Sequence, residues 1–186
     1  IGRGGVIAEL KGFRSYSKEV LGDRFRRSGE LFVKSLEIRA YALRALREVI
    51  EGALRDLDLE GFPSKGFRHL VIYPQHARVP ELVLSSLGNP KEVKVHNLIS
   101  TLGDLGAAMA PLCLISSLED SGPKEAHLVV SFGHGAGCDV VEFETTELIS
   151  EVARERPTLS DYLNSKEYID LVTYLKWRDH LKTEVS

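Results

Sequence analysis

Short apolar segments alternate with longer stretches of helical periodicity along most of this chain. An apolar run of four to six residues, or one that alternates apolar with polar, predicts a β-strand. Five segments fit that description: residues 6–10 continuing toward 16, 69–73, 93–95, 127–132 and 139–144. The chain is therefore predicted to build one sheet from strands that are well separated in sequence.

Three helices are predicted between these strands. Apolar residues recur at helical spacing from Leu36 to Leu57. Pro80–Leu87 follows as a second helix, since proline suits a first helical turn and Gly88 comes just after the end. Gly106–Leu118 is almost entirely apolar, so we expect a central helix that is buried on most sides. Residues 17–35, rich in arginine, glycine and lysine, are expected to form an irregular excursion.

This order of elements predicts an α/β fold: a five-stranded mixed sheet with helices on both faces, within residues 1–150. The last two strands are joined by only a few residues and must be antiparallel neighbours. Residues 151–186 are predicted to be a helical tail packed on this domain. Thr158 and Asp161 have the spacing of a capping box at the start of its first helix.

Composition narrows the possible functions. The chain has 186 residues, 43% of them hydrophobic, and a net charge of -3 that gives no reason to expect a nucleic acid or an anionic membrane as partner. No apolar run reaches the roughly 18 residues of a membrane span. Cys113 and Cys138 are expected to be small buried residues in a reduced, cytoplasmic protein. The start at Ile1 predicts a fragment, a processed subunit or one half of a longer protein.

Three segments carry the candidate chemistry, and each follows or adjoins a predicted strand. They are Tyr73–Pro80, Gly103–Ala108 and Ser131–Asp139. Because ligands of open α/β sheets lie beyond the carboxyl ends of the strands, we expect the three segments to converge on one cavity.

In this order the segments resemble the second half of a condensing enzyme of the thiolase superfamily, most closely an archaeal hydroxymethylglutaryl-CoA (HMG-CoA) synthase. The tail from Arg156 to Arg178 resembles the end of the same synthases. The resemblance implies a thiolase-like half-unit that works beside an N-terminal half carrying the nucleophilic cysteine, in the same chain or in a partner, within a homo- or hetero-oligomer. One apolar face or edge should meet that half. The resemblance also implies a coenzyme A thioester as substrate and no tightly bound cofactor.

Claisen-type condensation needs a cysteine that holds an acyl group and polar groups that stabilise an enolate and an oxyanion. The family histidine lies in a segment that reads roughly H-Q-P-N-G-K-F-P. Matching its last proline to Pro80, and its lysine to Arg78, puts Tyr73 at the histidine position. Matching the family glutamine instead puts Pro74 there, so neither register yields a histidine. His76 could reach the same site from a rebuilt loop; the alternative is a partly exposed loop histidine.

Asp104 stands at the position of the family asparagine. An amide donates a hydrogen bond to an enolate oxygen, whereas an ionised carboxylate only accepts one and repels negative charge. Asp104 would therefore help condensation only if protonated. The alternative is that Asp104 caps the helix that begins at Leu105 or Gly106.

The glycine turn from Phe132 to Gly137 resembles the family segment S-Y-G-S-G-A-G and is the best preserved of the three. Gly133 and its neighbours allow the backbone to approach a thioester and to point N–H groups at its oxygen. His134 stands where the family often has serine. A plain tight hairpin is the alternative, and it is compatible with the oxyanion role.

Arg14, Arg26 and Arg78 are candidates for contact with the phosphates of coenzyme A, because the resemblance puts the region of Arg14 near the substrate entrance. The alternative is a solvated charge run, since acidic residues are interleaved. The remaining histidines are scattered without metal-ligand spacing: His69, His96, His127 and His180. No metal site is therefore predicted.

Two functions stay open on the sequence alone. The first is an HMG-CoA synthase-like acyltransferase of which this chain is the C-terminal half. The second is a non-catalytic thiolase-like subunit that scaffolds a complex or binds an acyl-CoA without turning it over. The replaced histidine and asparagine favour the second, and the preserved glycine turn favours the first.

Overall fold

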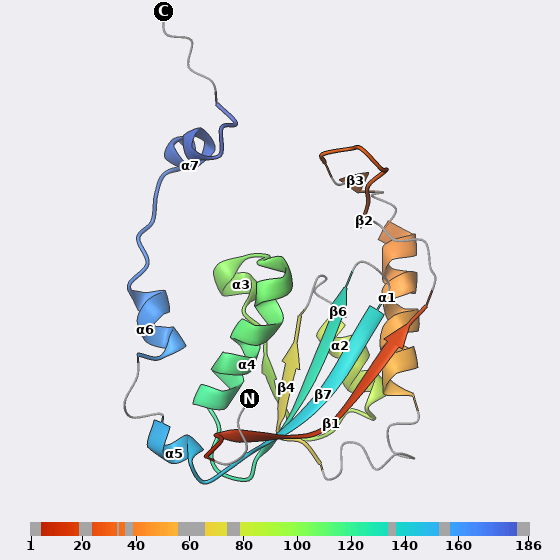
Figure 1. Cartoon of the computed structure of the whole chain (residues 1–186), viewed down its shortest axis with the longest axis vertical. Helices are drawn as coiled ribbons and strands as arrows, with labels where there is room; N and C mark the ends of the chain where they lie inside the picture. Colours follow the sequence, from red (N-terminus) through yellow and green to blue (C-terminus); the bar gives the residue numbers. More distant parts are fainter. Residues whose placement is uncertain are drawn as a thin grey trace, which may run out of the picture. The chain divides into compact units, whose positions relative to one another are not determined.

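The central feature of the fold is a five-stranded sheet with strand order β1-β7-β6-β4-β5 (Figure 1). The computed structural model describes residues 5–18, 24–32, 34–35, 39–55, 66–73, 79–133, 137–152 and 157–181. The strands are β1 (Ala8–Ser17), β4 (His69–Ile72), β5 (Lys94–His96), β6 (Ala126–Gly133) and β7 (Gly137–Thr145). The pairs β4–β5 and β4–β6 are parallel, while β6–β7 and β1–β7 are antiparallel. The predicted mixed sheet is confirmed.

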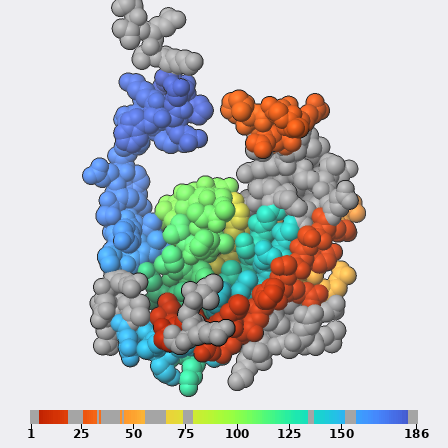
Figure 2. All heavy atoms as spheres, viewed as in Figure 1, coloured from red at the N-terminus to blue at the C-terminus, as the bar shows by residue number. Residues whose placement is uncertain are grey.

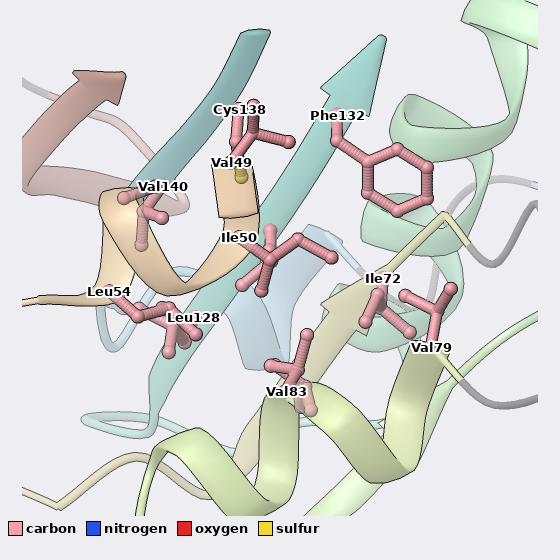
Figure 3. Close-up of a cluster of buried hydrophobic side chains, with 13 residues drawn as sticks. Val49, Ile50, Leu54, Ile72, Val79, Val83, Leu128, Phe132, Cys138 and Val140 are labelled. Carbon is pink, nitrogen blue, oxygen red and sulfur yellow. The ribbon is translucent and has the colours of Figure 1, made fainter. Parts of the chain in front are cut away.

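Helices cover both faces of this sheet, as predicted. Helices α1 (Arg39–Leu54) and α2 (Val79–Ser86) pack on one face, where Ile50 and Val83 meet Ile72 of β4 (Figure 3). Helix α4 (Met109–Glu119) packs on the other. Side chains of a strand alternate between faces, so Leu70 and Ile72 point to α1 and α2 while Val71 points to α4. Each such fully buried aliphatic side chain contributes about 1.5–3 kcal/mol through burial.

Helix α4 departs from the prediction of a helix buried on most sides. The segment is divided into a 3₁₀ helix, η2 (Gly106–Ala108), and α4, and only one stripe of α4 is fully buried. That stripe is Met109, Cys113 and Ser117, spaced four residues apart. The opposite side is apolar but uncovered, with Ile115 44% exposed. Among the described residues of the first unit, the sheet covers only one side of α4, so apolar side chains on its other side stay exposed.

The remaining elements are short. Residues 17–35, predicted to be irregular, contain a two-stranded ladder of β2 (Arg24–Phe25) and β3 (Lys34–Ser35). Two short helices, α3 (Ile99–Leu102) and α5 (Ile149–Val152), were not predicted. The predicted ends of the first helix, residues 36–38 and 56–57, lie outside the described residues.

The chain divides into two compact units, residues 1–155 and 156–186. The second contains α6 (Leu159–Asn164) and α7 (Leu171–Trp177). The predicted capping box is present: Asp161 N–H donates to the Thr158 hydroxyl, and Thr158 N–H donates to the Asp161 carboxylate. The packing of this tail on the first unit stays a prediction. Among the described residues, no helix is long and apolar enough to span a membrane.

Candidate functional site

The three candidate segments meet at one edge of the sheet. Ile72 pairs with Val130 in the parallel β4–β6 ladder, so Tyr73 leaves β4 level with the last residues of β6. The turn between Gly133 and Gly137 begins at the same edge, because those two residues are the final pair of the β6–β7 hairpin. The carboxyl ends of the parallel strands therefore bring the described ends of the first and third segments to one edge of the sheet. Their convergence on one cavity stays a prediction.

Tyr73 links all three segments. Its side chain is buried, and its hydroxyl donates a hydrogen bond of 2.7 Å to Oδ1 of Asp104. Its ring stacks on Phe132, next to Gly133, with centroids 5.6 Å apart and planes 15° from parallel. Tyr73, Asp104 and Phe132 thus form one cluster, which we call the Tyr73 cluster.

The local backbone explains why Asp104 can reach Tyr73. Gly103 and Gly106 flank it with φ of 74° and 56°, a region that glycine adopts without the strain of a side chain. The same oxygen, Oδ1, also accepts the backbone N–H of Gly106 at 2.8 Å. The expected contact with the start of the following helix is confirmed, although the N-cap position itself falls on Leu105.

The chemistry of the Tyr73 cluster differs from that of a histidine–asparagine pair. The Asp104 carboxylate is an acceptor for a phenol and for an amide. The phenol proton is directed to that carboxylate rather than toward a substrate. The two positions that should donate to an enolate therefore bond to each other.

The other predicted site residues are placed less fully. His76, Arg78 and His134 lie outside the described residues. Arg14 lies on β1 opposite Val140, near the strand end at the edge of the Tyr73 cluster, because Ser17 pairs with Gly137. Arg26 follows β2 and is exposed. Their contact with coenzyme A stays a prediction.

Neither cysteine is suited to carry an acyl group. Both Cys113 and Cys138 are free thiols and fully buried, as predicted. Burial raises the pKa of the Cys138 thiol to about 12 and also raises the pKa of Cys113. Since the thiolate is the nucleophile, a condensing reaction would need a cysteine from outside this chain.

The sequence-based description of the histidines as scattered is wrong for three of them. His69, His96 and His127 are all buried on the α4 face of the sheet. His69 and His127 are paired in the parallel β4–β6 ladder, and their rings stack 4.5 Å apart. The nitrogen Nδ1 of His69 lies 2.9 Å from Nε2 of His96.

One sequence signal could have revealed this histidine cluster. Strands β4 and β6 both contain His-Leu-Val, at 69–71 and 127–129. Two similar strands that lie side by side in parallel register bring identical residues together. Spacing along the chain cannot show this, because 58 positions separate His69 from His127.

The amino-acid sequence of this chain is similar to sequences of known proteins. No protein-family model matches the chain. Two similar relatives are the hydroxymethylglutaryl-CoA synthase of Methanopyrus kandleri (30% identical over 189 residues, 98% of this chain) and that of Pyrobaculum aerophilum (32% over 184 residues, 98% of this chain). The match covers 52% of each relative, so the chain spans about half the length of these curated relatives.

Solved structures agree on the fold. A crystal structure of HMG-CoA synthase complexed with CoA superposes with a TM-score of 0.64 and 14% identity, covering 91% of this chain and 47% of that one. The 3-oxoacyl-(acyl carrier protein) synthase III of Pseudomonas aeruginosa gives a TM-score of 0.58 and 21% identity, covering 74% and 44%. The chain therefore has a thiolase-like fold, and its sequence is similar to the C-terminal half of archaeal HMG-CoA synthases.

Proposed function

We propose that this chain is the C-terminal half of an acyl-CoA protein like HMG-CoA synthase. It supplies the enolate and oxyanion side of a condensing site in which Tyr73 and Asp104 replace the family histidine and asparagine. Its substrate is a coenzyme A thioester, and its compartment is the cytoplasm. The nucleophilic cysteine comes from an N-terminal half, in the same chain or a partner.

The hydrogen bond from Tyr73 to Asp104 carries this proposal. It supports the register that puts Tyr73, rather than Pro74, at the histidine position, because Tyr73 contacts the residue at the asparagine position. A condensing site lowers its barrier with donors aimed at the developing oxyanion. Here the phenol bonds to a carboxylate, so we infer that carbon–carbon bond formation is slow while thioester binding persists.

An exposed apolar surface supports the proposal that an N-terminal half packs against this chain. Leu10 and Phe13 of β1 are 57% and 72% exposed, and they pair with Phe143 and Val141, which pack on the α4 side of the sheet. Helix α4 packs on β4, β5 and β6 and leaves this part of the face open. In Figure 2, β1 (red) and α4 (green) lie on the same side of the molecule. We infer that the N-terminal half covers this surface together with Ile115.

The function is tested on the intact protein with acetyl-CoA and acetoacetyl-CoA. We expect calorimetry to detect acyl-CoA binding, with condensation at least roughly 10²-fold slower than in relatives that hold both donors. Residues 1–186 alone should show no condensation, because both thiols are buried. Condensation by the intact protein at a rate equal to its relatives would contradict the inference drawn from the Tyr73–Asp104 bond.

The exposed apolar surface also favours a second candidate, a non-catalytic subunit that holds a larger complex together. Such a subunit needs the surface of β1 and α4 but no acyl-CoA site. Absence of acyl-CoA binding by the intact protein, together with stable association, would select this candidate.

The interface is tested by Phe13→Asp. A charge introduced at an aromatic contact should weaken association of the two halves at least tenfold, or, within one chain, lower the melting temperature. Arg44→Asp on α1, which packs on the opposite face, is the matched control and should change neither. Light scattering of the intact protein measures association of the halves, and thermal unfolding measures the melting temperature. Equal behaviour of the two variants would remove the surface of Phe13 from the interface.

A further inference from the structure

The histidine cluster lies at the opposite end of the sheet from the Tyr73 cluster. His69 opens β4 and Tyr73 follows its end, so four residues separate them, roughly 13 Å at the rise of a β-strand. One atom each from His69, His96 and Asp120 lies within 4.8 Å of the other two. Asp120 directly follows α4 and brings its carboxylate 4.0 Å from Nε2 of His96. Imidazole nitrogens with a carboxylate are a usual ligand set of zinc.

The spacing needs little adjustment to hold a metal ion. On a tetrahedral zinc ion with Zn–N of roughly 2.0–2.1 Å, two ligand atoms stand about 3.3 Å apart. The two histidine nitrogens, at 2.9 Å, would open by a few tenths of an ångström. The carboxylate would close by about 0.7 Å on His96 and by up to about 1.5 Å on His69. Its side chain is 38% exposed and would leave its ion pair with Lys94 to do so.

The positions of the ring protons on His69 and His96 are also compatible with metal binding. The Nε2 atom of His69 lies 2.8 Å from the Glu125 carboxylate. A proton on that nitrogen leaves the lone pair of Nδ1 directed at His96. This is the arrangement in which a carboxylate orients a metal-bound histidine from behind. A neutral His96 ring with its proton on Nε2 donates to that lone pair. Metal binding then needs only a tautomer change that moves the His96 proton to Nδ1.

We propose that His69, His96 and Asp120 form a binding site for a divalent transition metal of the zinc class, with Glu125 orienting His69 and water completing the coordination. Lys94 competes for the site, since its ammonium forms an ion pair with the same Asp120 oxygen. The metal would join the end of α4 to β4 and β5. It would brace the fold at the edge away from the Tyr73 cluster.

The test is titration of the tag-free, chelator-treated intact protein with Zn²⁺ and Co²⁺. We expect one Zn²⁺ per chain, a raised melting temperature, and a visible Co²⁺ spectrum of four-coordinate type. His96→Gln should weaken binding at least about 100-fold and Asp120→Asn at least about tenfold, since loss of a group that only orients a ligand already costs about 10–100-fold. Lys94→Gln should strengthen binding several-fold, because it removes the competing cation.

Two features keep this test decisive. Asp120 and Lys94 are 38% and 59% exposed, so their variants retain the fold even if His96→Gln does not. His180→Gln, an exposed histidine of the second unit, is the control and should bind as the parent does. The proposal is overturned if the parent binds no Zn²⁺. It is also overturned if Asp120→Asn and Lys94→Gln bind with the parent's affinity.

Discussion

Tyr73→His combined with Asp104→Asn is expected to raise condensation by the intact protein by about 10²–10³-fold. Each substitution replaces a side chain engaged in the Tyr73–Asp104 hydrogen bond with one that donates to an enolate oxygen. Loss of one such donor in other enzymes costs about 10²–10³ in rate, so restoring both should have an effect at least that large. Formation of HMG-CoA from acetyl-CoA and acetoacetyl-CoA measures it, with one coenzyme A released from acetyl-CoA per product.

The matched control is Tyr73→Phe. It removes the hydrogen bond to Asp104 but keeps the ring that stacks on Phe132, and it adds no donor. We expect no gain in condensation and no change in acyl-CoA binding. A gain equal to that of the double variant would show that the bond merely blocks the site. No gain in the double variant, with acyl-CoA bound normally, would remove this cluster from the condensing site.

Unfolding in the presence of a chelator is expected to become several kcal/mol easier between pH 7 and pH 5. Burial, then the charges of neighbouring histidines, lower the pKa of His127 to about 4, and burial and His69 lower that of His96 to about 4. The ordinary value is 6.5, so in this window the unfolded chain binds protons that the folded chain does not. Stability is therefore complete above about pH 6.5 and falls toward pH 4, by about 2 kcal/mol per histidine at pH 5.

Other charged groups around these rings change protonation at lower pH. The hydrogen bond from Lys94 lowers the pKa of Asp120. Burial pushes the pKa of Glu125 upward, but hydrogen bonds from His69 and the Gly122 N–H outweigh it and leave that pKa lowered. These carboxylates therefore contribute mainly below about pH 4, outside the window of the test.

Denaturant unfolding at several pH values measures this dependence. His127→Gln should reduce its slope between pH 5 and pH 6 by about one proton, whatever it does to absolute stability. His180→Gln is exposed and should leave the slope unchanged. A parent protein equally stable at pH 7 and pH 5 would contradict the buried, neutral state of the cluster.

Tyr73 and Asp104, which stand at the histidine and asparagine positions of the family, are arranged differently from the polar groups of a condensing enzyme. In most such sites the polar groups are held apart so that each faces the substrate. Here Tyr73 and Asp104 satisfy each other at 2.7 Å. Absence of acyl-CoA binding would thus select the scaffold, and binding without any condensation would select a non-catalytic acyl-CoA-binding subunit, while the fold is common to all of these.

The sheet and most of its helices follow from local patterns in the sequence. Short apolar runs and alternation of apolar with polar residues are patterns of consecutive residues. Strands β4, β6 and β7 are therefore predicted from their own segments. The capping box of Thr158 and Asp161 is likewise local, because its two partners are three residues apart. The three candidate segments were expected at one edge since parallel strands end together.

Contacts between residues far apart in the sequence could not be predicted, because they depend on how the elements pair and pack. The bond from Tyr73 to Asp104 joins positions 31 residues apart, in a segment where Gly103 and Gly106 both have positive φ. His69 and His127 meet only because β4 and β6 pair in one register. The prediction that α4 is buried on most sides is wrong for the described residues, where Ile115 is exposed. An apolar composition indicates that a surface needs a packing partner, but not which part of the protein supplies it.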